Sequence, residues 1–203
     1  ANIDWAAIAN ITYGTKHGDA QLNATVTQAK LIDDADKSGT FTYRIGSATG
    51  PAAKDYVLPA GENTLHVTYE PHADDTVAYT ANTATAKINV DKANLTVSIN
   101  QVTGYTYGDA LPQIFPADLK VEGLVNGDTS PAIFEPSNGG VQPVVAIDPA
   151  VAEDGFVAGA PALLTFGQAP SAANYNIAVN GNNMPIARRD LTVKAVDTSM
   201  TYG

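Results

Sequence analysis

ITYGTKHGD, from Ile11 to Asp19, contains a Thr-Tyr-Gly string that returns twice in this chain of 203 residues. The string recurs in YTYGDAL, from Tyr105 to Leu111, and again in the last three residues. Tyr13 and Tyr107 lie 94 residues apart, and Tyr107 and Tyr202 lie 95 residues apart. A period of this length exceeds that of solenoid repeats and is long enough for a complete domain. The spacing therefore predicts domains in tandem, each opened by one copy of the string.

Other landmarks follow nearly the same period. Tyr79 lies 96 residues before Tyr175, and Leu95 lies 96 residues before Leu191. We predict a first repeat at residues 1–92, a second repeat at residues 93–189, and the first strand of a third repeat at residues 190–203. A tyrosine buries its ring while its hydroxyl reaches a polar partner, and glycine allows the chain to turn with a positive φ. The predicted structural anchors of the repeats are Tyr13, Gly14, Tyr107, Gly108, Tyr79 and Tyr175.

Alternation of apolar and polar residues predicts strands with one buried face. The pattern is clear in residues 41–45, 65–70, 84–91 and 95–100. Period two with one polar face is typical of antiparallel strands over a core. Turn-forming strings such as Asn126-Gly127-Asp128 separate the segments. No stretch of about ten residues has helical periodicity, although residues 148–153 are compatible with one turn of helix. We therefore expect an all-β chain of two tandem Ig-like β-sandwich domains.

Longer strings resemble repeats of large bacterial surface proteins. LPAGENTLHVTYEPHADDTVAYTANTATAKINVDKA, Leu58 to Ala93, resembles their Ig-like domains. In the second repeat KANLTV, TYGD, VEGLVNGDT and SAANYNIAV resemble the MBG repeat of the YGX type, which occurs in tandem in mucin-binding adhesins. The resemblance implies an extracellular location at a bacterial cell surface, with neighbouring repeats of the same chain as partners.

The resemblance leaves two functions open. In the first, the repeats are a structural stalk or spacer that projects a distal binding domain of an adhesin. In the second, the repeats themselves bind mucin or other glycans of a host or environmental surface. The first repeat lacks the GLVNGDT string, and Val141 to Ala160 does not match the family pattern. The resemblance supplies no catalytic or ligand-binding motif to place on these residues.

Composition disfavours several other classes of function. The chain carries 11 Lys and Arg against 21 Asp and Glu, a formal net charge of −10. This charge repels nucleic acid and anionic lipid, so we expect no nucleic-acid partner. The apolar runs, such as Trp5 to Ala9 and Val144 to Ile147, are too short to insert into a membrane. Hydrophobic residues make up 44% of the chain, which is enough for packed cores without disulfides.

The residues that carry catalysis elsewhere form no recognisable pattern here. The chain has no cysteine, no Gly-x-Ser-x-Gly string and no His-Glu-x-x-His string. His66 falls on the polar side of an alternating segment, and His17 and His72 fall in polar turns. We therefore predict that the protein is not an enzyme and holds no cofactor.

Calcium is the one metal that the sequence brings into consideration. Asp34 and Asp36 precede Gly39 with the spacing of the first half of a calcium loop, but Ile45 stands where a bidentate Glu is required. These aspartates are the weak candidates for a metal site, and a solvated acidic hairpin is the expected alternative. Two further alternatives remain open from the sequence: a calcium ion bound between neighbouring domains, and an isopeptide bond between a buried Lys and an Asn.

Overall fold

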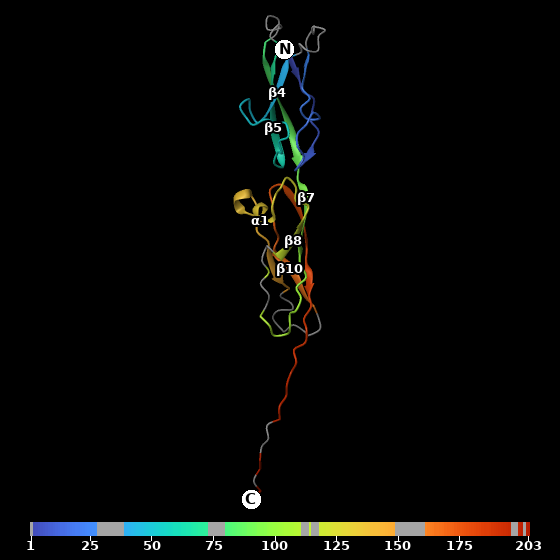
Figure 1. Cartoon of the computed structure of the whole chain (residues 1–203), viewed down its shortest axis with the longest axis vertical. Helices are drawn as coiled ribbons and strands as arrows, with labels where there is room; N and C mark the ends of the chain where they lie inside the picture. The colour runs from blue at the N-terminus through green and yellow to red at the C-terminus, as the bar shows by residue number, and fades with distance from the viewer. Residues whose placement is uncertain are drawn as a thin grey trace. The chain divides into compact units, whose positions relative to one another are not determined.

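The chain folds as an all-β protein with one short α-helix among the residues described (Figure 1). A computed structural model describes residues 2–27, 39–72, 80–110, 114, 118–148, 161–195, 199–200 and 202–203. The all-β prediction is confirmed. The chain divides into two compact units. Unit 1 comprises Ala1–Thr96, Val121–Gln142 and Pro170–Ala178, and unit 2 comprises Val97–Lys120, Pro143–Ala169 and Val179–Gly203. The predicted repeat boundaries at residues 92 and 189 stay a prediction.

Two sheets of unit 1 lie before residue 92. Strands β1 (Asn2–Asp4) and β3 (Thr25–Thr27) pair antiparallel. The second sheet has the order β2-β6-β5-β4. Its strands are β2 (Ile11–Thr12), β4 (Thr40–Ile45), β5 (Gly61–Glu70) and β6 (Asn82–Asp91). Strand β6 pairs antiparallel with β5 and parallel with β2.

The alternation in the sequence explains how this sheet builds a core. Leu65, Val67 and Tyr69 of β5 are buried, whereas the residues between them are less buried. Ile88 and Val90 of β6 are buried in the same alternating way. Successive side chains of a strand point to opposite faces, so one face of the sheet supplies the apolar interior.

Two further sheets contain the remaining strands. One sheet has the order β11-β7-β8 and the other has the order β12-β10-β9. The strands are β7 (Ala93–Ile99), β8 (Leu119–Glu122), β9 (Val144–Ile147), β10 (Ala162–Gln168), β11 (Tyr175–Asn180) and β12 (Asn182–Met184). Within unit 2, Ala162, Leu164 and Met184 are fully buried. Strand β10 pairs antiparallel with β9 and β12, with an irregular register between Phe166 and Gln168.

A short helical segment lies in unit 1, at a place that the strand pattern did not predict. Helix α1 (Ser130–Ile133) is followed by a 3₁₀ turn at Pro136–Asn138. Pro131 lies in the first turn of α1, where a missing backbone N–H costs no hydrogen bond. The turn of helix considered for residues 148–153 lies outside the described residues, apart from Asp148.

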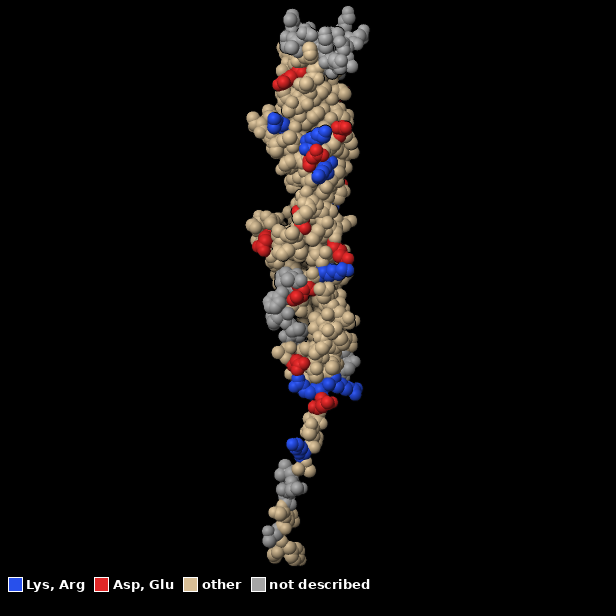
Figure 2. Space-filling model, in the orientation of Figure 1, with Lys and Arg blue, Asp and Glu red and all other residues tan. Residues whose placement is uncertain are grey.

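The described surface carries few charges. On the face drawn in Figure 2, acidic and basic side chains are scattered among a majority of uncharged ones. None of the described helices has the length and apolar character of a membrane span.

Candidate functional site

The first copy of Thr-Tyr-Gly forms a tight turn at the end of β2, here called the first Tyr-Gly turn (residues 12–15). Thr12 pairs with Asp91 in the parallel ladder of β2 and β6, and the backbone N–H of Tyr13 donates to the Asp91 carbonyl at 2.8 Å. The turn closes through the N–H of Thr15, which donates to the Thr12 carbonyl at 3.0 Å. Gly14 has a φ of 94°, which an L-residue adopts only with strain.

The second copy makes the same backbone contacts within unit 2, in the second Tyr-Gly turn (residues 106–109). Thr106 forms a parallel bridge with Ala187, and the N–H of Tyr107 donates to the Ala187 carbonyl at 2.9 Å. The N–H of Asp109 donates to the Thr106 carbonyl at 3.0 Å, and Gly108 has a φ of 83°. Ala187 lies 96 residues after Asp91, so the hydrogen bonding repeats with the sequence.

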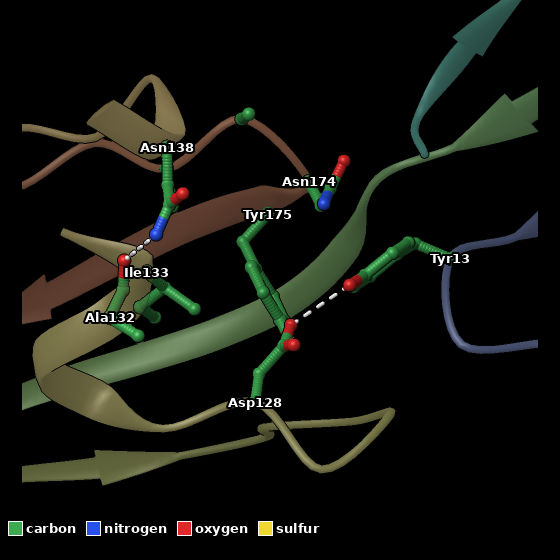
Figure 3. A pocket seen from close by; sticks show the side chains of 9 residues that line it. Tyr13, Asp128, Ala132, Ile133, Asn138, Asn174 and Tyr175 are labelled. Carbon is green, nitrogen blue, oxygen red and sulfur yellow. Dashed lines mark hydrogen bonds between the residues drawn. The ribbon is translucent and has the colours of Figure 1, made fainter. Parts of the chain in front are cut away.

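The side chain of Tyr13 leads to a hydrogen-bonded polar group in unit 1, the Tyr-Asp-Tyr cluster of Tyr13, Asp128 and Tyr175 (Figure 3). Oδ2 of Asp128 accepts the Tyr13 hydroxyl at 3.0 Å and the Tyr175 hydroxyl at 2.7 Å. The two tyrosine rings meet edge to face, with centroids 5.5 Å apart. One carboxylate oxygen therefore fixes two buried aromatic side chains.

Local backbone chemistry places the carboxylate. Asn126 and Gly127 both have positive φ, and the N–H of Asp128 donates to the Val125 carbonyl at 3.0 Å to close the turn. The Val125 N–H donates to the Tyr175 hydroxyl at 3.1 Å. Asn-Gly is a strong turn former because both residues tolerate positive φ, so the turn predicted at residues 126–128 is present. Tyr175 starts β11, which sets the direction of its ring.

A pocket of about 330 Å³ adjoins the cluster in unit 1. Polar groups of its lining are engaged inside the protein. Nδ2 of Asn138 donates to the Ala132 carbonyl at 2.8 Å, and Oδ1 of Asn174 accepts the Ala60 N–H at 3.0 Å. Its lining residues are Tyr13, Asp128, Ala132, Ile133, Asn138, Ala172, Ala173, Asn174 and Tyr175.

The environment of the cluster shifts the titration of both tyrosines. Burial raises the pKa of Tyr175 to about 12, and the hydrogen bond to the Asp128 carboxylate acts in the same direction. Burial also raises the pKa of Tyr13, again with support from Asp128. Both hydroxyls therefore stay protonated at neutral pH and donate to the carboxylate.

The six predicted anchors are found in different environments. Tyr13 and Tyr175 are buried, whereas the side chain of Tyr107 is exposed. Gly14 and Gly108 occupy equivalent turn positions. Tyr79 lies outside the described residues, as do both candidate metal ligands, Asp34 and Asp36. Within the part of the chain that the structure describes, no three His, Asp or Glu side chains gather in a group able to hold a metal ion.

Two aromatic residues of unit 1 have neighbours that the sequence did not reveal. His17, predicted in a polar turn, is fully buried, and this prediction of its environment is wrong. Its Nδ1 donates to the Tyr56 carbonyl at 2.8 Å, while its Nε2 is buried with no partner among the described residues. Trp5 donates from Nε1 to the Gln21 carbonyl at 3.1 Å and packs edge to face against Tyr43. These contacts make both residues parts of the packing of unit 1.

Asp128 is the member of the cluster that sequence analysis missed. Asn126-Gly127-Asp128 was predicted only as a turn, and the acceptor role of its aspartate depends on residues far away in the chain. One signal in the sequence set this aspartate apart: the first repeat has no counterpart of the GLVNGDT string that contains Asp128. Comparison of the chain with protein-family models, curated proteins and solved structures finds no match.

The two turn glycines give a matched pair of substitutions. A Cβ at Gly14 would lie 2.7 Å from Cγ2 and 2.9 Å from Cβ of Val125, whereas a Cβ at Gly108 meets nothing closer than 3.8 Å. Both alanine variants carry the strain of positive φ, about 1–2 kcal/mol, and only Gly14→Ala adds overpacking of about 1–3 kcal/mol. We expect urea unfolding to give a clearly larger loss of stability for Gly14→Ala. Equal losses would contradict the packing of Val125 on this turn.

Stability should also fall at high pH because of the cluster. An unfolded tyrosine releases its proton near pH 10.0, whereas Tyr175 holds its proton to about 12. The folded state therefore binds more protons in this window, and the stabilisation present below pH 10 is lost as pH rises toward 12. The free energy of unfolding, measured in urea from pH 9 to 11.5, should decline less steeply in Tyr175→Phe. Tyr202→Phe, which changes a fully exposed side chain, is the control. Equal dependence of stability on pH in the original chain, Tyr175→Phe and Tyr202→Phe would contradict the raised pKa of Tyr175.

Proposed function

We propose that this chain is a pair of tandem Ig-like β-sandwich repeats that serve as a spacer in a bacterial cell-surface adhesin. In this function the repeats hold a distal binding domain away from the cell and are joined to further repeats of the same protein. The observation that carries the proposal is the recurrence of one turn with one set of backbone hydrogen bonds, at Thr12 to Asp91 and at Thr106 to Ala187.

The Tyr-Asp-Tyr cluster supports a mechanical function. Tyr13 belongs to the first predicted repeat, and Asp128 and Tyr175 belong to the second, yet all three lie in unit 1. Their hydrogen bonds are charge-assisted and partly shielded from water, which makes them stronger than neutral ones. A spacer needs strong contacts of this kind, because a flexible string of domains would not hold the distal binding domain at a fixed distance from the cell.

The same cluster weighs against carbohydrate stacking. Sugars stack on exposed aromatic faces, but the rings of Tyr13 and Tyr175 are buried. Asp128, Asn138 and Asn174 all make hydrogen bonds within the protein. The side chains that would recognise a ligand are therefore already committed to the fold.

Glycan binding is the second candidate, and the pocket beside the cluster is the observation that favours it. Its volume of about 330 Å³ and its amides at Asn138 and Asn174 suit a small polar ligand. A glycan array that includes mucin-type glycans separates the candidates. The spacer proposal predicts no binding by the chain. Binding that is lost in Asn138→Ala, a residue whose substitution leaves Asp128 and both tyrosines intact, would replace the spacer proposal with the second candidate.

Force spectroscopy tests the spacer proposal directly. The chain is held by its two ends and stretched until it unfolds. Two tandem domains of about 95 residues should unfold in two steps, each releasing roughly 30 nm of chain at about 3.3–3.6 Å per residue. A single step that releases the whole chain would contradict the tandem arrangement. Gly14→Ala should lower the force of the unfolding step that includes the first Tyr-Gly turn, and Gly108→Ala should lower the force of the step that includes the second.

A further inference from the structure

We infer that the second Tyr-Gly turn and residues 190–195 form a docking surface for a further β-domain of the second-repeat type. In this arrangement the added domain presents its equivalent of Asp128 to the hydroxyl of Tyr107. The inference rests on the proposed tandem organisation and adds to it the site and the chemistry of the joint.

The two Tyr-Gly turns have the same backbone and different surroundings. Only 8% of Tyr13 is exposed, because its ring packs on Tyr175 and its hydroxyl bonds to Asp128. Tyr107, in the equivalent position of the second turn, is 44% exposed. The second turn therefore already has the backbone conformation that the first turn adopts where Tyr175 and Asp128 contact Tyr13.

The glycines repeat this contrast. Gly14 lies under the side chain of Val125, at a distance that leaves no room for a Cβ. The nearest side-chain atoms to a Cβ at Gly108 belong to the Arg189 guanidinium, 3.8 Å away. A glycine that is covered by a valine in one turn is thus accessible in the other.

The segment that follows each turn partner differs in the same way. Leu95 and Val97 follow Asp91 and are buried in β7. Leu191 and Val193 lie 96 residues later, follow Ala187 and are 88% and 83% exposed. Apolar side chains spaced two apart lie on one face of an extended segment, and burying them on a sheet is favourable.

Polar contacts hold the second turn in its docking conformation. Oδ2 of Asp109 accepts the Thr106 N–H at 3.0 Å, and Oδ1 of the same carboxylate pairs with the Arg189 guanidinium. The hydroxyl of Tyr105 donates to the Asp109 carbonyl at 3.0 Å. The partner that fits this surface has a valine to cover Gly108 and a carboxylate to accept the Tyr107 hydroxyl, as the loop at residues 125–128 offers to the first turn.

An extended chain tests the inference. Residues 95–189 are repeated after Asp190, so that Leu95 of the copy takes the place of Leu191. Tyr107→Phe, Asp128→Ala in the added copy, and both together form a double-mutant cycle that is followed by urea unfolding. Because the hydrogen bond is to a charged acceptor, we expect the two sites to be coupled by about tenfold or more in the unfolding equilibrium constant. Independent, additive effects would overturn the inference.

Chemical nitration followed by mass spectrometry gives a second readout, which does not depend on the variants. In the original chain Tyr107 should react readily, while Tyr13 should be protected. In the extended chain the nitration rate of Tyr107 should fall about tenfold, toward that of Tyr13. An unchanged rate in an extended chain whose added domain is folded, as shown by its urea unfolding transition, would overturn the inference. Tyr107→Phe in the original chain is the control and should leave its stability unchanged. The spacer proposal is judged separately, by glycan binding and forced unfolding of the original chain.

Discussion

A single carboxylate oxygen, Oδ2 of Asp128, holds two tyrosine hydroxyls whose residues lie 162 positions apart in the chain. Burying a tyrosine is favourable for the ring and unfavourable for the hydroxyl unless the hydroxyl has a partner. Asp128 supplies that partner for Tyr13 and Tyr175 together. If the carboxylate were removed, two buried hydroxyls would lose their charged acceptor at once, and the loss of an acceptor costs about 1–3 kcal/mol for each hydroxyl left unsatisfied. The packing of the first Tyr-Gly turn therefore depends on a residue of a distant loop.

The repeated turn connects this contact to the function that we propose. In a tandem protein each domain must be positioned by contacts that every neighbouring repeat can supply. The first Tyr-Gly turn bonds to Asp91 and the second bonds to Ala187 in the same way, so the chain forms the same turn surface twice. In unit 1 that surface is covered by Val125 and Asp128, and in unit 2 Tyr107 remains accessible. The spacer function and the docking surface that we propose both rest on this recurring turn.

Sequence analysis succeeded where structure depends on neighbours in the chain. Alternation predicted the buried faces of β5, β6 and β7, because a strand sends every second side chain to the same side. Turn chemistry predicted the bend at Asn126-Gly127, because few residues accept positive φ. Helix α1 was missed because four residues are too few to show a period, although Pro131 was a usable signal.

Contacts between distant residues were beyond the same reasoning. The role of Asp128 depends on where Tyr13 and Tyr175 arrive in space, and no local pattern encodes that meeting. His17 was misjudged for a similar reason, since its polar neighbours Lys16 and Asp19 suggested a wet turn while its ring enters the interior beside Tyr56. The Thr-Tyr-Gly period indicated that Tyr13 and Tyr107 were equivalent, but it did not reveal that only one of them is covered.

The central claim, that the Asp128 carboxylate fixes the first Tyr-Gly turn through the Tyr13 hydroxyl, is tested most directly by a double-mutant cycle in the original chain. The free energy of unfolding is measured in urea for Tyr13→Phe, Asp128→Ala and the double variant. Tyr13→Phe combined with Glu62→Gln, on an exposed ion pair with Lys87, is the matched control and should be additive. We predict a coupling energy of about 1–3 kcal/mol between Tyr13 and Asp128. Effects that simply add, as in the control pair, would contradict the account.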